Sequence, residues 1–485
     1  MTVRSVEVTS PVTLLKVGAD YEEGQGERIA VENPATGEQI AEISAASAAQ
    51  VERAVAAGKD ALRRGEVGAP EERAAYLHAL ADLITERRDE FLSIVVDEVG
   101  TPISTARDLH ISTPVEILHW LADRALVDRT EDLGANDGPG ASRAIVEYRP
   151  IGVAAGITAY NYPVLFNAMK LGSALAAGCP LVLVGSPLAP LSSLLFASLL
   201  EEAGIPSRAA SVLVGGVDTA KALIASQDVA KISFTGSVSS GEAVMAGAAA
   251  GLREVVLELG GKTAAILLPS ADLGALTTAL HHRYLRNAGQ GCASPTRLLV
   301  PSDRLEEFAE LSRTVYDRVP VGDPWDESTI VGPVITREHR ARVHGYIDGA
   351  VADGGTVVAS GHLPDEPGGW FVRPTLLGGL PNSARINQEE VFGPVASVLT
   401  YDTIDDAIDI ANGTKYGLHA SVFGDFEEAR RVATRLEAGT VTINGGGRVR
   451  PDAPNGGWKS SGIGRERGEL GVREYLEPVT VQWPA

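Results

Sequence analysis

The sequence predicts two α/β domains in series, and three observations support this fold class. The chain has 485 residues, which is too long for a single hydrophobic core. From Ile151 onward, short apolar runs such as PLVLV, ASVLVGG and AKISFTG alternate with helical stretches. A second block of the same kind runs from TRLLVP through GTVVAS and VASVLTY to AGTVTIN. Such alternation is typical of parallel sheets with crossover helices.

The elements before these two blocks follow from local patterns. Residues 31–43 predict a strand, a turn and a second strand, because Pro34 and Gly37 mark the turn. Apolar residues at helical spacing predict helices over residues 47–62, 71–100 and 114–126. Residues 128–148 combine a cluster of Gly, Pro and Asn with the strand-like AIVEY. This pattern indicates an irregular segment or a hairpin.

Charge and cysteine content narrow the function classes. The formal net charge of -21 argues against nucleic acids and anionic membranes as partners. The most apolar stretches are interrupted by Pro and Gly, and the first residues lack a secretory signal pattern. The two cysteines, Cys179 and Cys292, cannot form a disulfide framework or a cysteine-rich zinc site. We therefore expect a cytoplasmic enzyme without a metal.

Cys292 is the first candidate for chemistry, because a thiolate is a strong nucleophile. It lies in NAGQGCASPTR, where Gly289 and Gly291 leave room for a substrate carbonyl. Cys179, in ALAAGCPLVLV, is interpreted as a small buried hydrophobe. None of the nine histidines belongs to an evident motif, so a cysteine-protease function has little support. Glu258 ends an apolar run in LELGGKT and is a candidate general base, although such glutamates are more often solvated.

The sequence contains the motifs AYNYP, FTGS, LELGGK, GQGC, EEVFGP and PNGGWKSSGIGRERGELG. These six motifs occur in the order and spacing of the aldehyde dehydrogenase superfamily, and the chain resembles that family from Asn33 to its C-terminal tail. The resemblance implies an α/β fold with a Rossmann-like cofactor domain, an α/β catalytic domain and a small β oligomerisation element, and hence a homodimer or homotetramer. The implied boundaries are residues 1–126 and 149–258 for the cofactor domain, 259–470 for the catalytic domain, and 127–148 and 471–485 for the oligomerisation element.

The resemblance also implies a reaction, the oxidation of an aldehyde to a carboxylic acid with NAD or NADP as hydride acceptor. Cys292 would attack the aldehyde to give a thiohemiacetal, with Asn161 and the Cys292 backbone N–H as oxyanion donors. Hydride transfer would leave a thioester, which water activated by Glu258 hydrolyses. The presence of this glutamate favours release of a free acid over transfer to coenzyme A. Lys170 and Glu466 match residues that support the base. Local sequence alone would make Asn161 a turn residue, and Lys170 and Glu466 solvated charges.

Cofactor contacts are implied by further matches. Glu390 and Phe392 in EEVFGP match residues that hold the nicotinamide ribose and pack near its ring. FTGSVSSG matches a turn where pyrophosphate meets a helix N-terminus, although a plain Ser/Gly turn would have the same sequence. The expected cofactor-binding positions are Thr158, Tyr160, Val184, Gly215, Thr235, Gly236, Ser237, Gly241, Leu259, Glu390 and Phe392.

The strand expected at the adenosine end departs from the family pattern. Val184 stands where a lysine normally donates to the ribose, and Pro187 stands where a glutamate often accepts from the 2′-hydroxyl. Losing a charged hydrogen bond forfeits ~1.5–3 kcal/mol, or roughly one to two powers of ten in affinity. Loss of the lysine removes an attraction for the 2′-phosphate of NADP, whereas loss of the glutamate removes a repulsion. The two effects on NADP affinity oppose each other, so the preference between NAD and NADP does not follow from the sequence. Tyr160 replaces a usual tryptophan and Ser173 a common proline, without touching the chemistry.

Two other functions remain compatible with these residues. A chain that binds dinucleotide poorly would still be able to act as a thiol esterase, since that reaction needs Cys292 and Glu258 but no hydride acceptor. A non-catalytic binding role is the third hypothesis, and the complete catalytic set argues against it. The identity of the aldehyde does not follow from the sequence. Arg448 and Arg450 in NGGGRVRPDAPNGG would favour an acidic aldehyde, but loop arginines are more often merely solvated.

Overall fold

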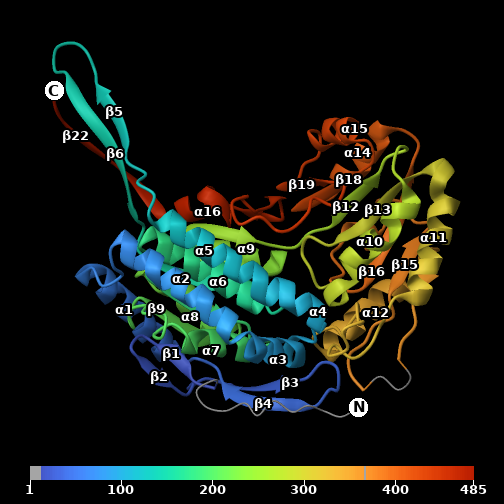
Figure 1. The fold of residues 1–485 in the computed structure, drawn as a ribbon, viewed down its shortest axis with the longest axis horizontal. Helices are drawn as coiled ribbons and strands as arrows, with labels where there is room; N and C mark the ends of the chain where they lie inside the picture. The colour runs from blue at the N-terminus through green and yellow to red at the C-terminus, as the bar shows by residue number, and fades with distance from the viewer. Residues whose placement is uncertain (1–12, 365–367) are drawn as a thin grey trace.

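The computed structural model describes residues 13–364 and 368–485, which form two sheet-centred bodies and a projecting β arm (Figure 1). The arrangement confirms the α/β fold class. Helices cover both sheets, as the crossover pattern predicts. Within the described residues, no helix has the length and apolar character needed to cross a membrane.

The first body is centred on a sheet that has eight strands in the described residues, in the order β2-β1-β9-β8-β7-β10-β11-β21. The five strands from β9 to β11 are mutually parallel. Strands β7, β8 and β9 are buried along their whole length, which explains their unbroken apolar sequences. The strands are β1 (Leu15–Val17), β2 (Asp20–Glu22), β7 (Val153–Ile157), β8 (Leu181–Gly185), β9 (Ala210–Val214), β10 (Val229–Thr235), β11 (Glu254–Glu258) and β21 (Gly462–Ile463).

The helices of this body confirm most of the predicted helical stretches, with one correction. Residues 71–100, predicted as one stretch, form two helices that meet at Arg87, whose φ of -94° and ψ of 18° are not helical. The helices are α1 (Ala48–Arg64), α2 (Pro70–Glu86), α3 (Arg88–Val99), α4 (Ile103–Ala106), the π-helix η1 (Arg107–Ser112), α5 (Thr113–Ala125), α6 (Pro163–Ala177), α7 (Leu191–Ser198), α8 (Val217–Ala225) and α9 (Val238–Ala249).

The second body has its own sheet, with seven strands in the described residues in the order β14-β15-β16-β13-β12-β18-β19. Separate apolar clusters fill its interior, around Tyr284 and around Ile266. The strands are β12 (Thr263–Leu267), β13 (Pro295–Pro301), β14 (Thr356–Ser360), β15 (Thr375–Gly378), β16 (Val395–Tyr401), β18 (His419–Phe423) and β19 (Thr440–Ile443). The helices are α10 (Leu273–Leu285), η2 (Arg286–Gly289), η3 (Ser302–Arg304), α11 (Leu305–Arg318), α12 (Arg337–Ala352), α13 (Arg385–Gln388), α14 (Ile404–Asn412) and α15 (Phe426–Ala433).

The remaining elements confirm both predicted hairpins and connect the two bodies. β3 (Arg28–Glu32) pairs with β4 (Gln39–Ser44), and β5 (Glu131–Ala135) pairs with β6 (Ser142–Pro150). β22 (Leu476–Pro484) follows α16 (Gly468–Arg473) and pairs with β6, so the arm joins distant segments of the chain (Figure 1). β17 (Tyr416–Gly417) pairs with β20 (Trp458–Lys459). Since β21 belongs to the first sheet, residues 259–470 do not all contribute to the second one. The domain boundaries themselves stay a prediction.

Candidate active site

Cys292 is presented by an unusual backbone segment at the end of α10. Asn287, Ala288 and Gly289 have φ values of 53°, 52° and 73°, a left-handed run that only glycine and asparagine adopt readily. Packing holds this run in place. The Thr101 hydroxyl donates to the Asn287 side-chain carbonyl over 2.8 Å, and a Cβ on Gly289 would lie 2.0 Å from the carbonyl oxygen of Gly393. The Cys292 side chain therefore sits on a fixed loop.

The Cys292 thiol is held in its neutral form. Burial raises its pKa to about 12, and the negative charges of Glu258 and Glu390 add to the shift. Cys292 as a whole residue is half-buried. Because the thiol stays protonated at neutral pH, attack by sulfur requires a nearby group that accepts its proton.

Asn161 lies beside the Cys292 loop. Its side-chain NH₂ donates to the Gln290 carbonyl over 2.9 Å, and its own backbone carbonyl accepts a hydrogen bond of 3.3 Å from the Asn287 side chain. One amide hydrogen of Asn161 is thus used to fix the side chain, and the second is left to donate elsewhere. The structure therefore places Asn161 against the loop that carries Cys292, as an oxyanion site requires.

Glu258, Lys170 and Glu466 are linked through Asn455, a residue that the sequence analysis missed. Asn455 donates from its side chain to Glu258 over 2.7 Å, and its backbone exchanges two hydrogen bonds of 2.7 Å with Glu466. The Glu466 carboxylate accepts from Lys170 over 2.5 Å and from the Ser233 hydroxyl over 3.1 Å. Lys170 and Glu466 are 1% and 7% exposed, so the alternative of solvated surface charges is wrong.

Glu258 has the properties of a base that works near neutral pH. It is buried at the carboxyl end of β11, where parallel-sheet proteins commonly place functional groups. Its pKa is raised to about 8, mainly by burial and also by the charge of Glu466, while the charge of Lys170 opposes the shift. One carboxyl oxygen, Oε1, is buried without a hydrogen-bond partner. This oxygen is available to a water molecule or a thiol proton.

The turn between β10 and α9 offers groups that suit a pyrophosphate. Ser237 caps α9 by accepting from the Ser240 N–H over 3.2 Å, which leaves other N–H groups of the first turn unbonded. The buried Thr235 hydroxyl has no partner in the protein. A Cβ on Gly241 would lie 2.5 Å from the Leu259 side chain, so glycine is required where the helix approaches the strand. These observations fit the pyrophosphate part of a dinucleotide.

Glu390 and Phe392 lie over the glycine turn that follows Glu258. Glu390 accepts from the Gly261 N–H over 3.0 Å, and its second oxygen would be 2.2 Å from a Cβ on Gly260. Phe392 has a φ of 59°, and its ring meets the ring of Tyr160 edge-on at 6.1 Å. Glu390 is therefore held against the turn that follows Glu258, and the rings of Tyr160 and Phe392 pack against each other.

The part of the site that would face the adenosine of a dinucleotide has fewer polar side chains. The Val184 carbonyl accepts from the Thr158 N–H over 3.0 Å, and the Val184 side chain is buried, so this position contributes no polar side chain. A Cβ on Gly215 would lie 2.1 Å from the Thr219 hydroxyl, which shows why glycine is needed there. The residues present therefore fit the nicotinamide and pyrophosphate parts of a dinucleotide better than the adenosine ribose.

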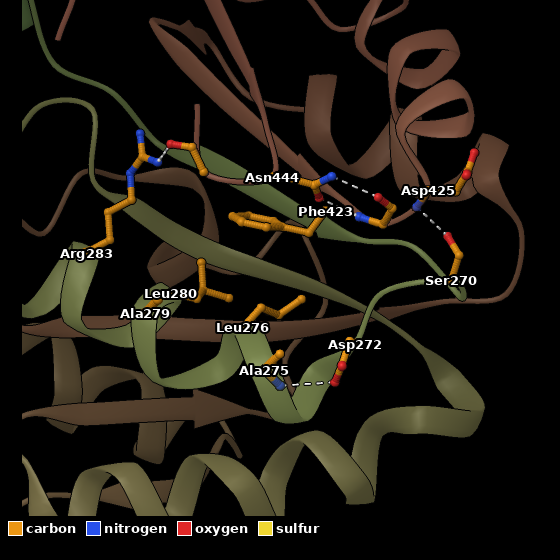
Figure 2. A pocket seen from close by; sticks show the side chains of 12 residues that line it. Ser270, Asp272, Ala275, Leu276, Ala279, Leu280, Arg283, Phe423, Asp425 and Asn444 are labelled. Carbon is orange, nitrogen blue, oxygen red and sulfur yellow. Dashed lines mark hydrogen bonds between the residues drawn. The ribbon is translucent and has the colours of Figure 1, made fainter. Parts of the chain in front are cut away.

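A cavity of about 720 Å³ lies outside this cleft (Figure 2). It opens between α10 and the end of β18, and neither Cys292 nor Glu258 lines it. Arg283 stands at one end of the cavity and donates to the Gly445 carbonyl over 2.6 Å (Figure 2). The cavity thus borders the loop after β19 but does not contain the reactive groups.

The model of the aldehyde dehydrogenase family matches residues 21–481 of this chain. A putative aldehyde dehydrogenase of Staphylococcus saprophyticus is 36% identical over 466 residues, which cover 95% of this chain and 96% of the relative. A solved mutant of aldehyde dehydrogenase C from Pseudomonas syringae, in complex with NAD+ and octanal, is 37% identical with a TM-score of 0.92, covering 98% of both chains. A Mycobacterium tuberculosis aldehyde dehydrogenase complexed with NAD+ is 35% identical with a TM-score of 0.93, covering 97% of this chain and 98% of that one.

Proposed function

The chain belongs to the aldehyde dehydrogenase family, and from this premise we propose that Cys292 is the nucleophile, Asn161 an oxyanion donor and Glu258 the general base of its reaction. The reaction is the oxidation of an aldehyde to a carboxylic acid with a nicotinamide dinucleotide as hydride acceptor. The observation that supports the assignment of residues is that their segments adjoin. Asn161 donates to the Gln290 carbonyl of the Cys292 loop, and the glycine turn after Glu258 lies against Cys292, since a Cβ on Gly261 would be 2.4 Å from the Cys292 carbonyl oxygen.

In the first step, the Cys292 sulfur bonds to the aldehyde carbon while the thiol proton passes to the unpaired oxygen of Glu258. The carbonyl electron pair moves to the substrate oxygen, which becomes an oxyanion. The free amide hydrogen of Asn161 and the Cys292 backbone N–H stabilise it. One donor of this kind typically contributes ~10²–10³ in rate.

A bound dinucleotide supplies the hydride acceptor, which leaves a thioester on Cys292. Thr235, Ser237, Glu390 and Phe392 are the residues proposed to hold it, through the hydroxyl, helix-end, carboxylate and ring groups described above. We propose NAD as the dinucleotide, because the two solved relatives named above are complexes with NAD+.

Hydrolysis of the thioester completes the cycle. Glu258 first releases to solvent the proton that it took from the thiol, and its carboxylate then removes a proton from water. The resulting hydroxide adds to the thioester carbon, the carbon–sulfur bond breaks with its electron pair going to sulfur, and the Cys292 thiolate takes the proton back from Glu258 as the acid leaves. Asn455 orients Glu258, and the buried pair of Lys170 and Glu466 fixes the segment that carries Asn455. This intact base supports a free acid as product rather than a coenzyme A ester.

We also propose that the arm makes the chain a homo-oligomer in the cytoplasm. The arm leaves Leu133 60% and Trp483 41% exposed, and β19 forms an open edge of the second sheet (Figure 1). Exposed apolar side chains and open strand edges are features that association covers. The two cysteines are free thiols, which suits a reducing compartment.

The direct test is aldehyde-dependent formation of reduced nicotinamide, followed by its absorbance, with a panel of aldehydes and with NAD or NADP. We expect turnover by the wild type and none by Cys292→Ala, which should still bind NAD in calorimetric titration. Cys179→Ala is the matched control, since the structure buries that thiol elsewhere, and it should retain turnover. Full activity of Cys292→Ala would refute the assignment of the nucleophile.

A further inference from the structure

Two histidines on neighbouring helices approach each other outside the active site. His78 belongs to α2 and His119 to α5, and these two helices pack against each other (Figure 1). The Nδ1 atoms of the two rings are 2.8 Å apart, and the ring centroids are 5.1 Å apart. The side chains are 43% and 40% exposed, so solvent and dissolved ions reach the pair.

Each histidine also faces a carboxylate on the opposite helix. Nε2 of His78 lies 3.7 Å from Asp123 of α5, and Nε2 of His119 lies 3.6 Å from Asp82 of α2. Because a carboxylate accepts hydrogen bonds, each aspartate favours a proton on the Nε2 atom that it faces. With both protons on Nε2, the two Nδ1 atoms direct lone pairs at each other, and a cation is needed to stabilise that contact.

The separation of the two Nδ1 atoms suits two adjacent ligands of one metal ion. Metal–imidazole bonds are about 2.0–2.1 Å long, so two nitrogens that meet a metal at a right angle are about 2.8–3.0 Å apart. Right angles between ligands are typical of square-planar copper(II) and nickel(II), whereas tetrahedral zinc would need about 3.3 Å. Histidines that bind a metal commonly donate their other N–H group to a carboxylate. The two aspartates occupy the positions of such acceptors.

We propose that the Nδ1 atoms of His78 and His119 bind one divalent transition-metal ion, nickel(II) or copper(II) by their separation. Asp82 and Asp123 accept the Nε2 protons and hold both rings in the tautomer that binds. Within residues 13–364 and 368–485, no three His, Cys, Asp or Glu side chains are grouped as metal ligands. The protein therefore supplies two ligands, and water completes the coordination. The two positive charges of the ion balance the two aspartates.

This pair was not accessible to the sequence analysis, which expected an enzyme without a metal. The two histidines are 41 positions apart, and only the packing of α2 on α5 brings them together. None of the four side chains belongs to the proposed catalytic or cofactor-binding set. The metal site is therefore independent of the proposed reaction, and its failure would leave that reaction unchanged.

The test is calorimetric titration of the full chain with NiCl2, on protein that carries no polyhistidine tag. All proteins carry Cys292→Ala, because a thiolate is a competing metal ligand. We expect one nickel ion per chain and a Tm that rises with nickel and falls back after EDTA is added. His78→Gln and His119→Gln should each lower the nickel affinity at least about tenfold. MgCl2 should not bind, because magnesium prefers oxygen ligands.

Two further variants separate the imidazole pair from a single surface histidine. His362→Gln is the matched control: His362 faces Asp317 over 3.1 Å, and within the described part of the chain no second imidazole contacts it. This variant should keep the nickel affinity of the parent. Asp82→Asn removes one acceptor for an Nε2 proton and should weaken nickel binding roughly tenfold.

Three results would overturn the proposal. They are the absence of a bound nickel ion in the parent, equal nickel affinity in the parent and both histidine variants, and a site that takes magnesium as readily as nickel. Electron paramagnetic resonance of the copper(II)-loaded parent needs no substitution at the histidines. Splitting by two nitrogen ligands is expected there, and a spectrum of oxygen ligands alone would also contradict the site.

Discussion

Replacing Asn455 by leucine should move the pH dependence of turnover to higher pH. Asn455 is the hydrogen-bond donor that the structure shows for the Glu258 side chain, over 2.7 Å. A hydrogen bond to a charged group is worth about 1.5–3 kcal/mol, and one pKa unit corresponds to about 1.4 kcal/mol. Without this donor the carboxylate form of Glu258 is less stable, so its pKa rises by roughly one to two units above the value of about 8.

The sign of the effect follows from the active form of the base. Glu258 acts as a carboxylate, so turnover of the wild type should rise as pH increases through about 8. In Asn455→Leu the same rise should occur at higher pH, and at pH 7 kcat should fall about ten- to hundredfold. Toward pH 10 the two enzymes should converge.

The assay is kcat measured from pH 6 to pH 10 under saturating aldehyde and NAD, with circular dichroism to confirm folding across the range. Asn136→Leu, on the exposed hairpin of the arm, serves as the control and should give the wild-type profile. An Asn455→Leu profile with the same midpoint as the wild type would refute the reasoning, as would a uniform loss of rate at every pH.

Three further predictions follow from buried groups of the site. Asn161→Ala should lower kcat by ~10²–10³ with little change in NAD affinity, measured by steady-state kinetics and calorimetry. Lys170→Met leaves Glu466 as an unpaired buried carboxylate, and urea unfolding at pH 7 should show a loss of about 3–5 kcal/mol in the free energy of unfolding. Thr235→Val removes a hydroxyl that has no partner in the protein, so thermal stability should not fall, whereas NAD affinity should drop roughly tenfold; equal NAD affinity would contradict its role.

Local sequence patterns were sufficient for most of the fold. Strands such as β8 carry unbroken apolar sequences because both faces are covered, and turn residues mark the hairpins. The break at Arg87 was not predictable in this way. The stretch around it contains neither glycine nor proline, and α3 turns away to pack on α7 while α2 packs on α5. Tertiary packing, which local spacing does not encode, decides that boundary.

For the candidate site too, local motifs identify single residues, whereas contacts between distant parts of the chain are not predictable from the sequence. Cys292, Glu258 and Asn161 each lie in a motif that can be recognised from neighbouring residues. Asn455 lies in such a motif too, but its contact with Glu258 spans 197 positions and cannot be read from either stretch. The sequence does not show whether Arg448 and Arg450 are unpaired, and the structure pairs Arg448 with Glu116 over 2.8 Å and Arg450 with Asp452 over 2.6 Å.

The segment from Asn455 to Gly462 links the first sheet to β17, the short strand that directly precedes β18 of the second sheet. Its β20 strand pairs with β17, while Gly462 pairs with Glu258 at the edge of the first sheet. Ser461 donates to the Gly260 carbonyl over 2.7 Å and accepts from the Gly417 N–H over 3.0 Å. A movement that separated β17 from β21 would strain this segment and displace the Asn455 side chain that donates to Glu258. With Glu258 as the proposed base, activation of water then depends on this segment keeping its contacts with both β17 and β11.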